Sequence, residues 1–241
     1  EGFGSYSSRS VVMGGSAIVA AATKLREAIC ASAARRLGCA PADIEIADGG
    51  AARAPGGRTV ALAELAGDGL SGDGSYASNK RTYRYGAHAA HVAVDPGTGH
   101  VALIDYMAVE DVGRIINPET LHGQTVGAIV QGLGGTFLEH LVYDADGQLL
   151  TGSLADYLMP TMSDFPNIRA VALEVHRSPN NPLGAKGAGE GGIIPVAGVI
   201  ANAVASALSS LGVQPRDLPL TPPRLWHLIN DARAHSAGAS A

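Results

Sequence analysis

Cysteine is scarce in this sequence, and its scarcity excludes several kinds of site. The two thiols, Cys30 and Cys39, are too few for a disulfide framework, a four-cysteine zinc site or an iron–sulfur cluster. A pair of this kind is typical of reduced thiols inside a cell.

Aromatic residues, basic clusters and long apolar runs are also rare. Aromatic side chains make up 5% of the 241 residues, so small aliphatic side chains must pack the interior. The net charge is −5 and no basic face or arm is present, which argues against a nucleic-acid partner. No uncharged apolar run reaches the roughly 18 residues of a membrane span, and no signal peptide is visible. The chain opens with Glu1 and not Met, so we expect an interior or C-terminal piece of a longer protein, whose targeting signals would then be missing.

The patterns that are present indicate a mixture of helices and strands. Apolar residues at spacings of three and four predict a first long helix over 14–37, with Gly38 as its C-cap. Alternating polar and apolar residues between Thr82 and Val112 predict a long hairpin. The other expected elements are a strand at 43–47, a surface excursion at 51–80 with a short helix at 60–66, a helix at 119–138, a small hairpin at 143–150, a strand at 168–176, and helices at 193–211 and 223–232. Because no regular βαβ period connects them, we predict the α+β class, with one domain over 1–232 and a disordered tail at 233–241.

The most unusual segment is the glycine-rich loop at 184–192, GAKGAGEGG. Five glycines in nine residues contribute no packing and cost conformational entropy, which is typical of backbone that approaches a ligand closely. Glu190 lies between two glycines ahead of an apolar helix, where it is either a helix cap or a general base in an apolar pocket. Lys186 is either a solvated loop charge or the partner of an anionic group.

Two further segments have the composition of a ligand site. The opening run at 7–10 combines hydroxyl groups, one arginine and a following helix, which together suit a phosphate. It is neither a P-loop nor a Rossmann fingerprint, and a serine-rich end is also typical of an ordinary loop. The helix expected at 119–138 carries several glycines and the amide of Gln124, which suit either a flat ligand or a close helix–helix contact.

Motifs for metal ligands and for nucleophiles are absent from the sequence. It contains no HExxH, no GxSxG and no Cys/His nucleophile pattern. Among the eight histidines, only His88 and His91 have a suggestive spacing, and the strand pattern places them on opposite faces. We therefore expect no direct metal ligand in this chain.

Three segments in this order resemble the molybdenum hydroxylase family, which includes xanthine dehydrogenases, aldehyde oxidoreductases and aerobic carbon-monoxide dehydrogenases. The segments are SYSSRSVVMGGSA, VEDVGRIINPETLHGQTVGAIVQGLGGTFLE and SPNNPLGAKGAGEGG. Their spacing resembles the C-terminal part of the family's large, molybdopterin-binding subunit over 2–229. SRSVVMGGSA and DYLMPT resemble the bacterial branch that is similar to carbon-monoxide dehydrogenase. The resemblance implies that residues 1–232 are the C-terminal part of a molybdopterin-binding domain.

The resemblance also implies a role for individual residues. Glu190 matches the family's catalytic base, which takes a proton from a hydroxide on molybdenum while that hydroxide attacks a carbon centre and hydride passes to a sulfido ligand. Gln124 matches a glutamine beside the pterin. The polar stretch around the pterin phosphate, or around its dinucleotide extension, is matched by Ser7, Ser8, Arg9 and Ser10. The other residues that we assign to cofactor binding are neighbours in the same motifs: Gly123, Lys186, Gly187 and Gly189.

Cofactors and partners follow from the same resemblance. Molybdenum would be held through molybdopterin, in its mononucleotide or cytosine dinucleotide form, with [2Fe–2S] clusters and FAD on partner chains. The expected partners are the remaining N-terminal part of the large subunit or a split partner chain, an iron–sulfur subunit and a flavin subunit, with a small-molecule substrate. The expected location is cytoplasmic, either free or at the inner face of the membrane through partners. The alternative function is a non-catalytic truncated or split chain that only completes a partner subunit.

Overall fold

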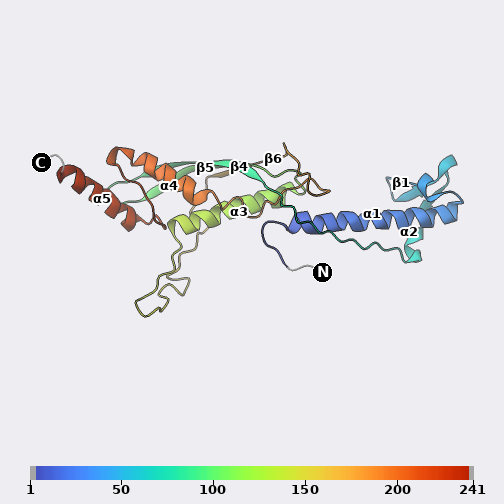
Figure 1. Cartoon of the computed structure of the whole chain (residues 1–241), viewed down its shortest axis with the longest axis horizontal. Coiled ribbons are helices and arrows are strands. Elements are labelled where there is room, and N and C mark those ends of the chain that lie inside the picture. The colour runs from blue at the N-terminus through green and yellow to red at the C-terminus, as the bar shows by residue number, and fades with distance from the viewer. Residues whose placement is uncertain (1–3, 239–241) are drawn as a thin grey trace. The chain divides into compact units, whose positions relative to one another are not determined.

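The computed structural model describes residues 4–238, and the chain divides into two compact units (Figure 1). The first unit comprises Glu1–Arg81 and Pro179–Gly184, and the second comprises Thr82–Ser178 and Ala185–Ala241. Within the described residues, each unit combines helices with a three-stranded sheet of its own, so the α+β prediction is confirmed.

The first unit is built on a long helix, α1 (Ser10–Leu37). Gly38 ends this helix in the left-handed conformation with φ of 63°, as the sequence predicts for its C-cap. The helix begins at Ser10, four residues earlier than expected. At Gly15 a Cβ would lie 2.7 Å from Cδ1 of Leu183, so this glycine allows the returning segment to approach the helix closely.

Short elements pack against the last turns of α1. They are the antiparallel strands β1 (Glu45–Ala47), β2 (Ala51–Arg53) and β3 (Thr59–Ala61), the helix α2 (Leu62–Leu65) and 3-10 turns at Pro41–Asp43, Pro55–Gly57 and Ala66–Asp68. The core between them consists mostly of small side chains: Cys30, Ala33, Ala34, Ile44, Ala52, Ala54, Val60 and Leu65.

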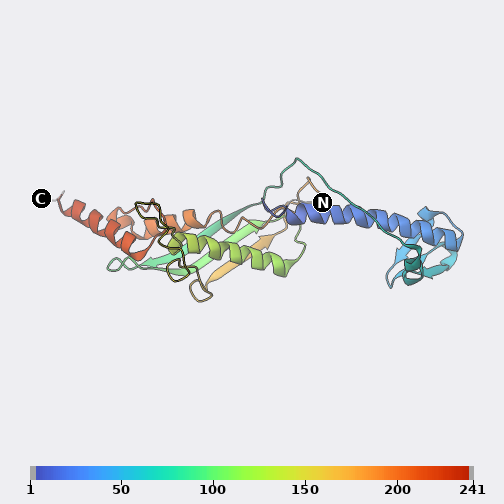
Figure 2. The ribbon, with the colours of Figure 1, turned by 90° about the horizontal axis from the view of Figure 1, so that it is seen from below.

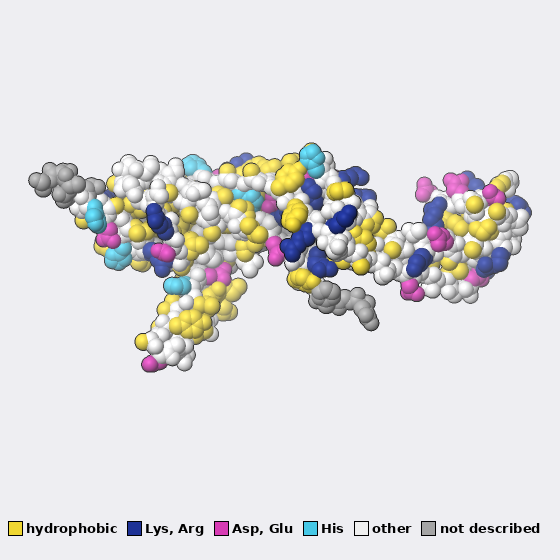
Figure 3. All heavy atoms as spheres, viewed as in Figure 1, with side chains coloured by type: hydrophobic (Ala, Val, Ile, Leu, Met, Phe, Trp, Pro, Cys, Tyr) yellow, Lys and Arg dark blue, Asp and Glu magenta, His cyan; other side chains and the backbone are white. Residues whose placement is uncertain are grey.

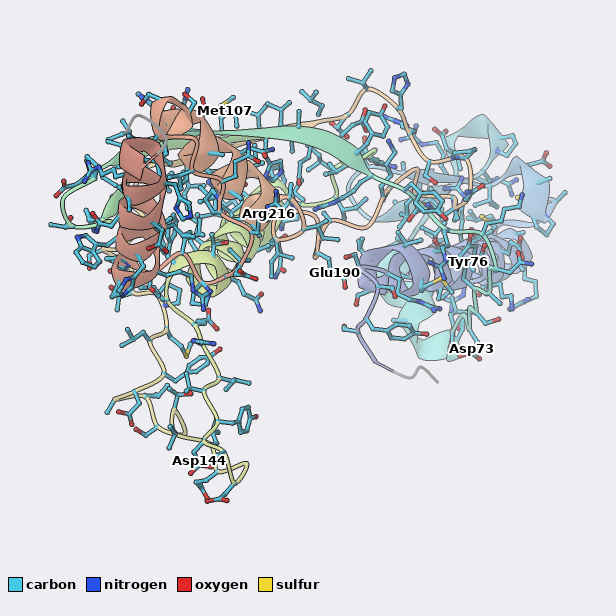
Figure 4. The ribbon with its side chains drawn as sticks, turned by 60° about the vertical axis from the view of Figure 1, so that its left-hand side comes forward. Asp73, Tyr76, Met107, Asp144, Glu190 and Arg216 are labelled. Atoms are coloured by element: carbon cyan, nitrogen blue, oxygen red, sulfur yellow. The ribbon has the colours of Figure 1, made fainter. Side chains whose placement is uncertain are left out.

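The prediction of a surface excursion over 51–80 is wrong, apart from its short helix, which α2 confirms. The segment contributes β2 and β3 to the sheet, and three-residue strands are too short for an alternating pattern to reveal. Beyond α2 the chain runs back along α1 near Asp73 and Tyr76 (Figure 4). A Cβ at Gly72 or Gly74 would lie 2.4 or 2.2 Å from backbone atoms of α1, so these glycines serve close packing.

The second unit contains a sheet with the strand order β4 (Tyr85–Val94), β5 (Val101–Asp111) and β6 (Ile168–Leu173). β4 and β5 form the expected hairpin, and β6 runs parallel to β5. A parallel neighbour needs a crossover connection, and this connection contains α3 (Pro118–Phe137). Helix α3 starts with proline at its first position, and the Asn117 side chain accepts a hydrogen bond from the Thr120 N–H at 3.1 Å.

Helices cover one face of this sheet. α3 and α4 (Val196–Ala207) lie side by side on it, and α5 (Pro222–Gly238) follows a proline-rich connector (Figures 1 and 2). The core between sheet and helices includes the fully buried Tyr106, Ala108, Ile129, Leu133, Val196, Ile200, Val204, Leu225 and Ile229. All except Tyr106 are aliphatic, as the low aromatic content predicts.

Residues 138–167, between α3 and β6, form an arm that projects from the second unit (Figures 1 and 3). Its own contacts shape it, including the β-bridge between Tyr143 and Leu149 and the hydrogen bond from the Tyr157 hydroxyl to Glu139 at 2.5 Å. Its exposed apolar side chains are Leu141, Tyr143, Leu150, Leu154, Leu158, Met159 and Met162. We call residues 138–167 the apolar arm.

The ends of the last two helices differ from the prediction. α4 begins at Val196 after a turn at 189–195, and a 3-10 turn at Ser209–Leu211 completes the segment. α5 continues to Gly238, so residues 233–238 are helical and not part of a disordered tail, while 239–241 lie outside the described residues. Small and polar residues favour a disordered tail, but the high helix propensity of alanine favours continuation of the helix.

Among residues 4–238, no helix combines the length and the apolar character that crossing a membrane requires. The same residues contain no group of three or more His, Cys, Asp and Glu side chains that could hold a metal ion.

Candidate functional site

Glu190 lies in the second unit, on the turn that leads from the glycine-rich loop to α4 (Figure 4). Its side chain is exposed, so the described residues do not enclose it in an apolar pocket. α4 begins six residues later, and its N-cap, Pro195, makes no side-chain cap hydrogen bond. The helix-cap interpretation of Glu190 is therefore excluded, and the general-base interpretation stays a hypothesis.

Lys186 is buried at the base of the loop and pairs with Asp111 at the end of β5. Its Nζ lies 2.9 Å from Oδ1 of Asp111, and the two side chains are 6% and 3% exposed. The same Nζ lies 4.5 Å from the centre of the Tyr85 ring, within range of a cation–π interaction. Lys186 thus pairs with an anionic group within the chain and is not a solvated loop charge, while its assignment to cofactor binding stays a prediction.

Asp111 is stabilised as a carboxylate by several donors. The N–H groups of Gly113 and His176 donate to its two oxygens at 3.0 and 2.9 Å, beside Lys186. Burial by itself raises the pKa of a carboxyl group, but these hydrogen bonds and the Lys186 charge outweigh it and lower the pKa of Asp111 to about 2. A β-bridge between Gly113 and Ala185 ties the same end of the loop to β5. The first half of the loop is therefore fixed to the sheet.

The other end of the loop is fixed to α3. A Cβ at Gly192 would lie 2.6 Å from the carbonyl oxygen of Thr125 and 2.8 Å from the Cβ of Ala128. Only a glycine permits this approach. Packing therefore explains part of the glycine density that the sequence analysis associates with a ligand. Within the same loop, Gly187 is buried and Gly189 is exposed.

The glycines of α3 differ in what surrounds them. In the C-terminal half of the helix, Gly132 and Gly134 would place a Cβ 2.7 Å from Val196 and 2.8 Å from Pro160. In the N-terminal half, Gly123 and Gly127 are exposed, and no atom lies within 4 Å of the position of a Cβ. The side chain of Gln124 is exposed as well. The close-contact interpretation thus describes Gly132 and Gly134, whereas the open N-terminal half suits a flat ligand.

The opening segment belongs to the first unit. Ser7 and Ser8 both adopt a φ of 51°, in the left-handed region that residues other than glycine rarely occupy. Successive residues with left- and right-handed backbone can turn their N–H groups toward one point, which suits an anion. Arg9, the N-cap of α1, makes no side-chain cap hydrogen bond, and its Nη1 donates to the hydroxyl of Tyr6 at 2.8 Å. Ser10 is the first residue of α1, with its hydroxyl oxygen 2.6 Å from that of Ser5.

Three residues that the sequence analysis did not single out support the loop. Arg84 donates from Nη1 to the carbonyl oxygen of Ala188 at 2.6 Å. Glu110 and Asp111 are adjacent and both almost fully buried, with 4% and 3% of each residue exposed. In the sequence, Glu110 and Asp111 could have been recognised as two consecutive acidic residues at the end of an apolar strand. A carboxylate that is buried there requires a partner.

Comparison with known proteins decides the family. Residues 1–166, more than half of the chain, match the family model of the molybdopterin cofactor-binding domain. The chain belongs to this family. The match confirms the resemblance to molybdenum hydroxylases that the three sequence segments indicate.

Three relatives of this molybdopterin cofactor-binding domain are much longer than the chain. Subunit gamma of the 6-hydroxypseudooxynicotine dehydrogenase complex of Paenarthrobacter nicotinovorans is 36% identical over 94% of this chain and 30% of its own length. The structure of quinoline 2-oxidoreductase from Pseudomonas putida 86 matches with a TM-score of 0.85 and 37% identity, over 95% of this chain and 31% of that one. The structure of CO dehydrogenase from Oligotropha carboxidovorans matches with a TM-score of 0.87 and 28% identity, over 97% and 30%. The chain spans less than a third of each of these proteins.

The residues of this domain fit the chemistry of a molybdopterin. The phosphate of the cofactor needs hydrogen-bond donors, and the left-handed backbone and hydroxyls at 7–10 are of that kind. Its flat, polar ring system needs backbone that can be approached closely, and the N-terminal half of α3 beside Gln124 offers such backbone at its open glycines. The residues at 7–10, which suit a phosphate, belong to the first unit, whereas Gln124, Lys186 and Glu190 belong to the second.

Proposed function

We propose that this chain is the C-terminal, cofactor-facing part of the large subunit of a molybdenum hydroxylase, with Glu190 as its general base. The observation that carries the proposal is the attachment of Glu190, an exposed carboxylate on a turn that follows a loop fixed at Lys186 and at Gly192. A general base must be accessible to the reacting group and must also hold a constant position relative to it. The loop meets both requirements.

The chain's own residues bind the cofactor and move a proton in this proposal. The molybdenum cofactor supplies the redox chemistry when it is bound. Backbone N–H groups and hydroxyls at 7–10, together with the guanidinium of Arg9, hold the phosphate, and the amide of Gln124 holds a polar edge of the pterin. Gly123, Gly187 and Gly189 let backbone approach the ring. A carboxylate oxygen of Glu190 accepts the proton of the group that attacks the substrate carbon, and Lys186 keeps the loop in place through Asp111.

Apolar surface supports the proposed partner, the remaining N-terminal part of the large subunit or a split chain that replaces it. The apolar arm exposes Leu154 at 76% and Met162 at 97% (Figure 3). The sheet face opposite α3 and α4, on which Met107 lies, also exposes apolar residues such as Val171 (Figure 4). Clustered exposed apolar side chains of this kind often mark a surface that binds another protein. The iron–sulfur clusters and the flavin lie on further partner chains in this proposal, because two cysteines cannot ligate two clusters.

N-heteroaromatic compounds are the substrate class that we propose to assay first. The quinoline enzyme is 37% identical to this chain, whereas CO dehydrogenase is 28% identical. The assay uses the complete complex and an artificial electron acceptor, with aldehydes, purines and carbon monoxide as the comparison substrates.

The proposed base is tested with Glu190→Gln in the assembled enzyme. Glutamine is nearly isosteric with glutamate but does not act as a base near neutral pH. We expect an unchanged molybdenum content per chain and a turnover that falls roughly 10²–10⁴-fold. The matched control is Glu27→Gln, at an exposed glutamate of α1, which should leave turnover unchanged. Near wild-type turnover of a fully loaded Glu190→Gln enzyme would refute the assignment.

The molybdenum content of the purified assembly distinguishes this function from the non-catalytic alternative. We expect close to one molybdenum per copy of this chain. Absence of molybdenum from an assembly that retains its other partners would favour a chain that only completes a partner subunit.

A further inference from the structure

A buried polar cluster lies behind the loop that carries Glu190. It consists of Arg84, just before β4, His88 on β4, and Tyr106 and Glu110 on β5. The side chains of Arg84, His88 and Glu110 are 11%, 2% and 6% exposed. His88 Nδ1 lies 2.8 Å from the Tyr106 hydroxyl, and His88 Nε2 lies 3.1 Å from Oε1 of Glu110. Arg84 Nη2 donates to the same Oε1 at 3.2 Å, so the four side chains form one connected chain of contacts.

At one end of this cluster, the guanidinium of Arg84 contacts the loop on both sides of Glu190. Its Nη1 donates to the carbonyl oxygen of Ala188 at 2.6 Å. A Cβ at Gly191 would lie 0.9 Å from Nη2, which means that the guanidinium occupies the space a side chain there would need. The positions two residues before and one residue after Glu190 are thus held by a single planar group.

The cluster is arranged at a cost to stability. Burial lowers the pKa of Arg84, and the nearby charges of Glu110 and Glu190 act in the opposite direction. Oε2 of Glu110 is buried and has no hydrogen-bond partner among the described residues. A buried carboxylate with one unsatisfied oxygen is unfavourable, and a well-packed apolar cluster of similar volume would stabilise the fold at least as well. Stability alone therefore does not account for these residue types.

We propose that Arg84 is a positioning residue that fixes the direction of the Glu190 carboxylate by holding Ala188 and Gly191, with Glu110 and His88 as its buried support. The inference rests on the proposed function of Glu190 as the general base. The planar guanidinium can donate to Ala188 from one nitrogen and to Glu110 from another while packing against Gly191. An ammonium group on a flexible stem cannot make this set of contacts.

The test compares Arg84→Lys with wild type in the assembled, cofactor-loaded enzyme. We expect kcat per bound molybdenum to fall about 10–100-fold, because displacing a reacting group by about 1 Å has an effect of this size. KM should change less than about threefold, since Arg84 is not proposed to touch substrate. Exogenous guanidinium should restore part of the turnover of Arg84→Ala. The control is Arg53→Lys at an exposed arginine of β2, which should leave kcat unchanged.

A second readout does not depend on activity. Hydrogen–deuterium exchange of the amides at 188–192 should accelerate in Arg84→Lys, while exchange in β5 and α4 stays as in wild type. If Arg84→Lys does not accumulate, Glu110→Gln weakens the same attachment from behind and should give the same faster exchange with a smaller loss of kcat. Unchanged exchange and unchanged kcat in the variant that accumulates would overturn the inference.

The double variant with Glu190→Gln separates this inference from the proposed function. If Arg84 acts through Glu190, Arg84→Lys has no further effect on kcat once Glu190 has been replaced. A multiplicative loss in the double variant would show that Arg84 acts elsewhere and would overturn the inference. Wild-type turnover in Glu190→Gln alone would instead overturn the proposed function, and exchange at 188–192 would still report whether Arg84 holds the loop.

Discussion

Individual charged residues in this chain differ in how far they are removed from water. Lys186 and Asp111 form a buried ion pair, in which Asp111 also accepts two backbone hydrogen bonds, whereas Arg169 and Asp105 pair at the surface. Removing one partner of a buried pair leaves an unpaired charge in the interior, while an exposed charge is returned to water. The two pairs therefore contribute differently to the free energy of unfolding. The sequence does not show this, because the difference lies in how deeply each pair is buried.

Asp111→Asn tests the buried pair. We expect a loss of about 3–5 kcal/mol in the free energy of unfolding at pH 7. The pKa of Asp111 is about 2 in the folded chain and 3.8 ordinarily, so its stabilising effect is present above pH 4 and is lost as the pH falls from about 4 to about 2. The difference in the free energy of unfolding between wild type and Asp111→Asn, measured in urea, should accordingly become smaller below pH 4. If this difference stays constant in acid, the ion pair does not stabilise the fold as described. The control is Asp105→Asn in the surface pair, which should lower the free energy of unfolding much less.

Arg9→Ala tests the proposed phosphate site in the first unit. A charge-assisted hydrogen bond to a phosphate is worth roughly 1.5–3 kcal/mol, so cofactor affinity of the assembled enzyme should fall about tenfold or more. Turnover per bound molybdenum should stay unchanged, because Arg9 is not proposed to act in the reaction. The measurement is molybdenum content after dialysis, with Arg26→Ala at an exposed position of α1 as the control. Full retention of molybdenum by Arg9→Ala would contradict the proposed phosphate site and would leave this segment as an ordinary loop.

At the scale of elements, α3 shows why a glycine-rich helix can be stable. Gly132 and Gly134 bring its backbone close to α4 and to the apolar arm, and its core residues Ile129 and Leu133 are fully buried. Tertiary packing of this kind outweighs the poor intrinsic helix propensity of glycine. Gly123 and Gly127 contribute nothing to that packing, which is why a ligand role is proposed for this part of the helix.

Gly123→Ala separates stability from cofactor binding. Alanine in a helix interior is favoured over glycine by about 0.5–1 kcal/mol, and no atom within 4 Å opposes the new methyl group, so the melting temperature of the chain should rise. In the assembled enzyme the same methyl group should lower molybdenum content if the pterin approaches here. Gly198→Ala, at an equally open position in α4, should affect stability in the same direction and leave molybdenum content unchanged. Equal molybdenum contents in both variants would place the pterin elsewhere.

At the scale of the whole molecule, the chain exposes apolar surface that a self-sufficient protein would bury. The apolar arm keeps its shape through its own hydrogen bonds, so its outward apolar side chains are not a consequence of disorder. The chain also spans less than a third of its relatives. The exposed apolar surface supports the proposed partner.

The isolated chain should therefore purify without molybdenum and should self-associate in gel filtration. Replacing two arm residues, Leu154→Ser and Met162→Ser, should reduce this association without lowering the melting temperature, because both side chains are already exposed. Asp146→Asn, a polar exchange on the same arm, is the control. A stable, cofactor-loaded monomer of the unmodified chain would contradict both this prediction and the proposed need for a partner.

Much of the fold was accessible from local sequence patterns. The hairpin of β4 and β5, the helix α3 to within one residue at each end, and the C-cap at Gly38 follow from alternation, periodicity and capping, which act between residues close in the chain. The three-residue strands β2 and β3 did not follow, because a period cannot be detected in three residues. The helical end of α5 does not follow from the small and polar composition of 233–238, although alanine there has a high helix propensity.

The sequence by itself also determined the family and the candidate residues Glu190, Gln124 and Ser7–Ser10, through motifs that are contiguous. Only the tertiary structure decided that Lys186 pairs with Asp111, 75 residues away, and that Arg84 contacts the loop on both sides of Glu190. Contacts of this kind depend on which strand ends meet in the sheet and on which side chains lose water there. No local pattern records either, because burial is a property of the folded chain and not of the residue.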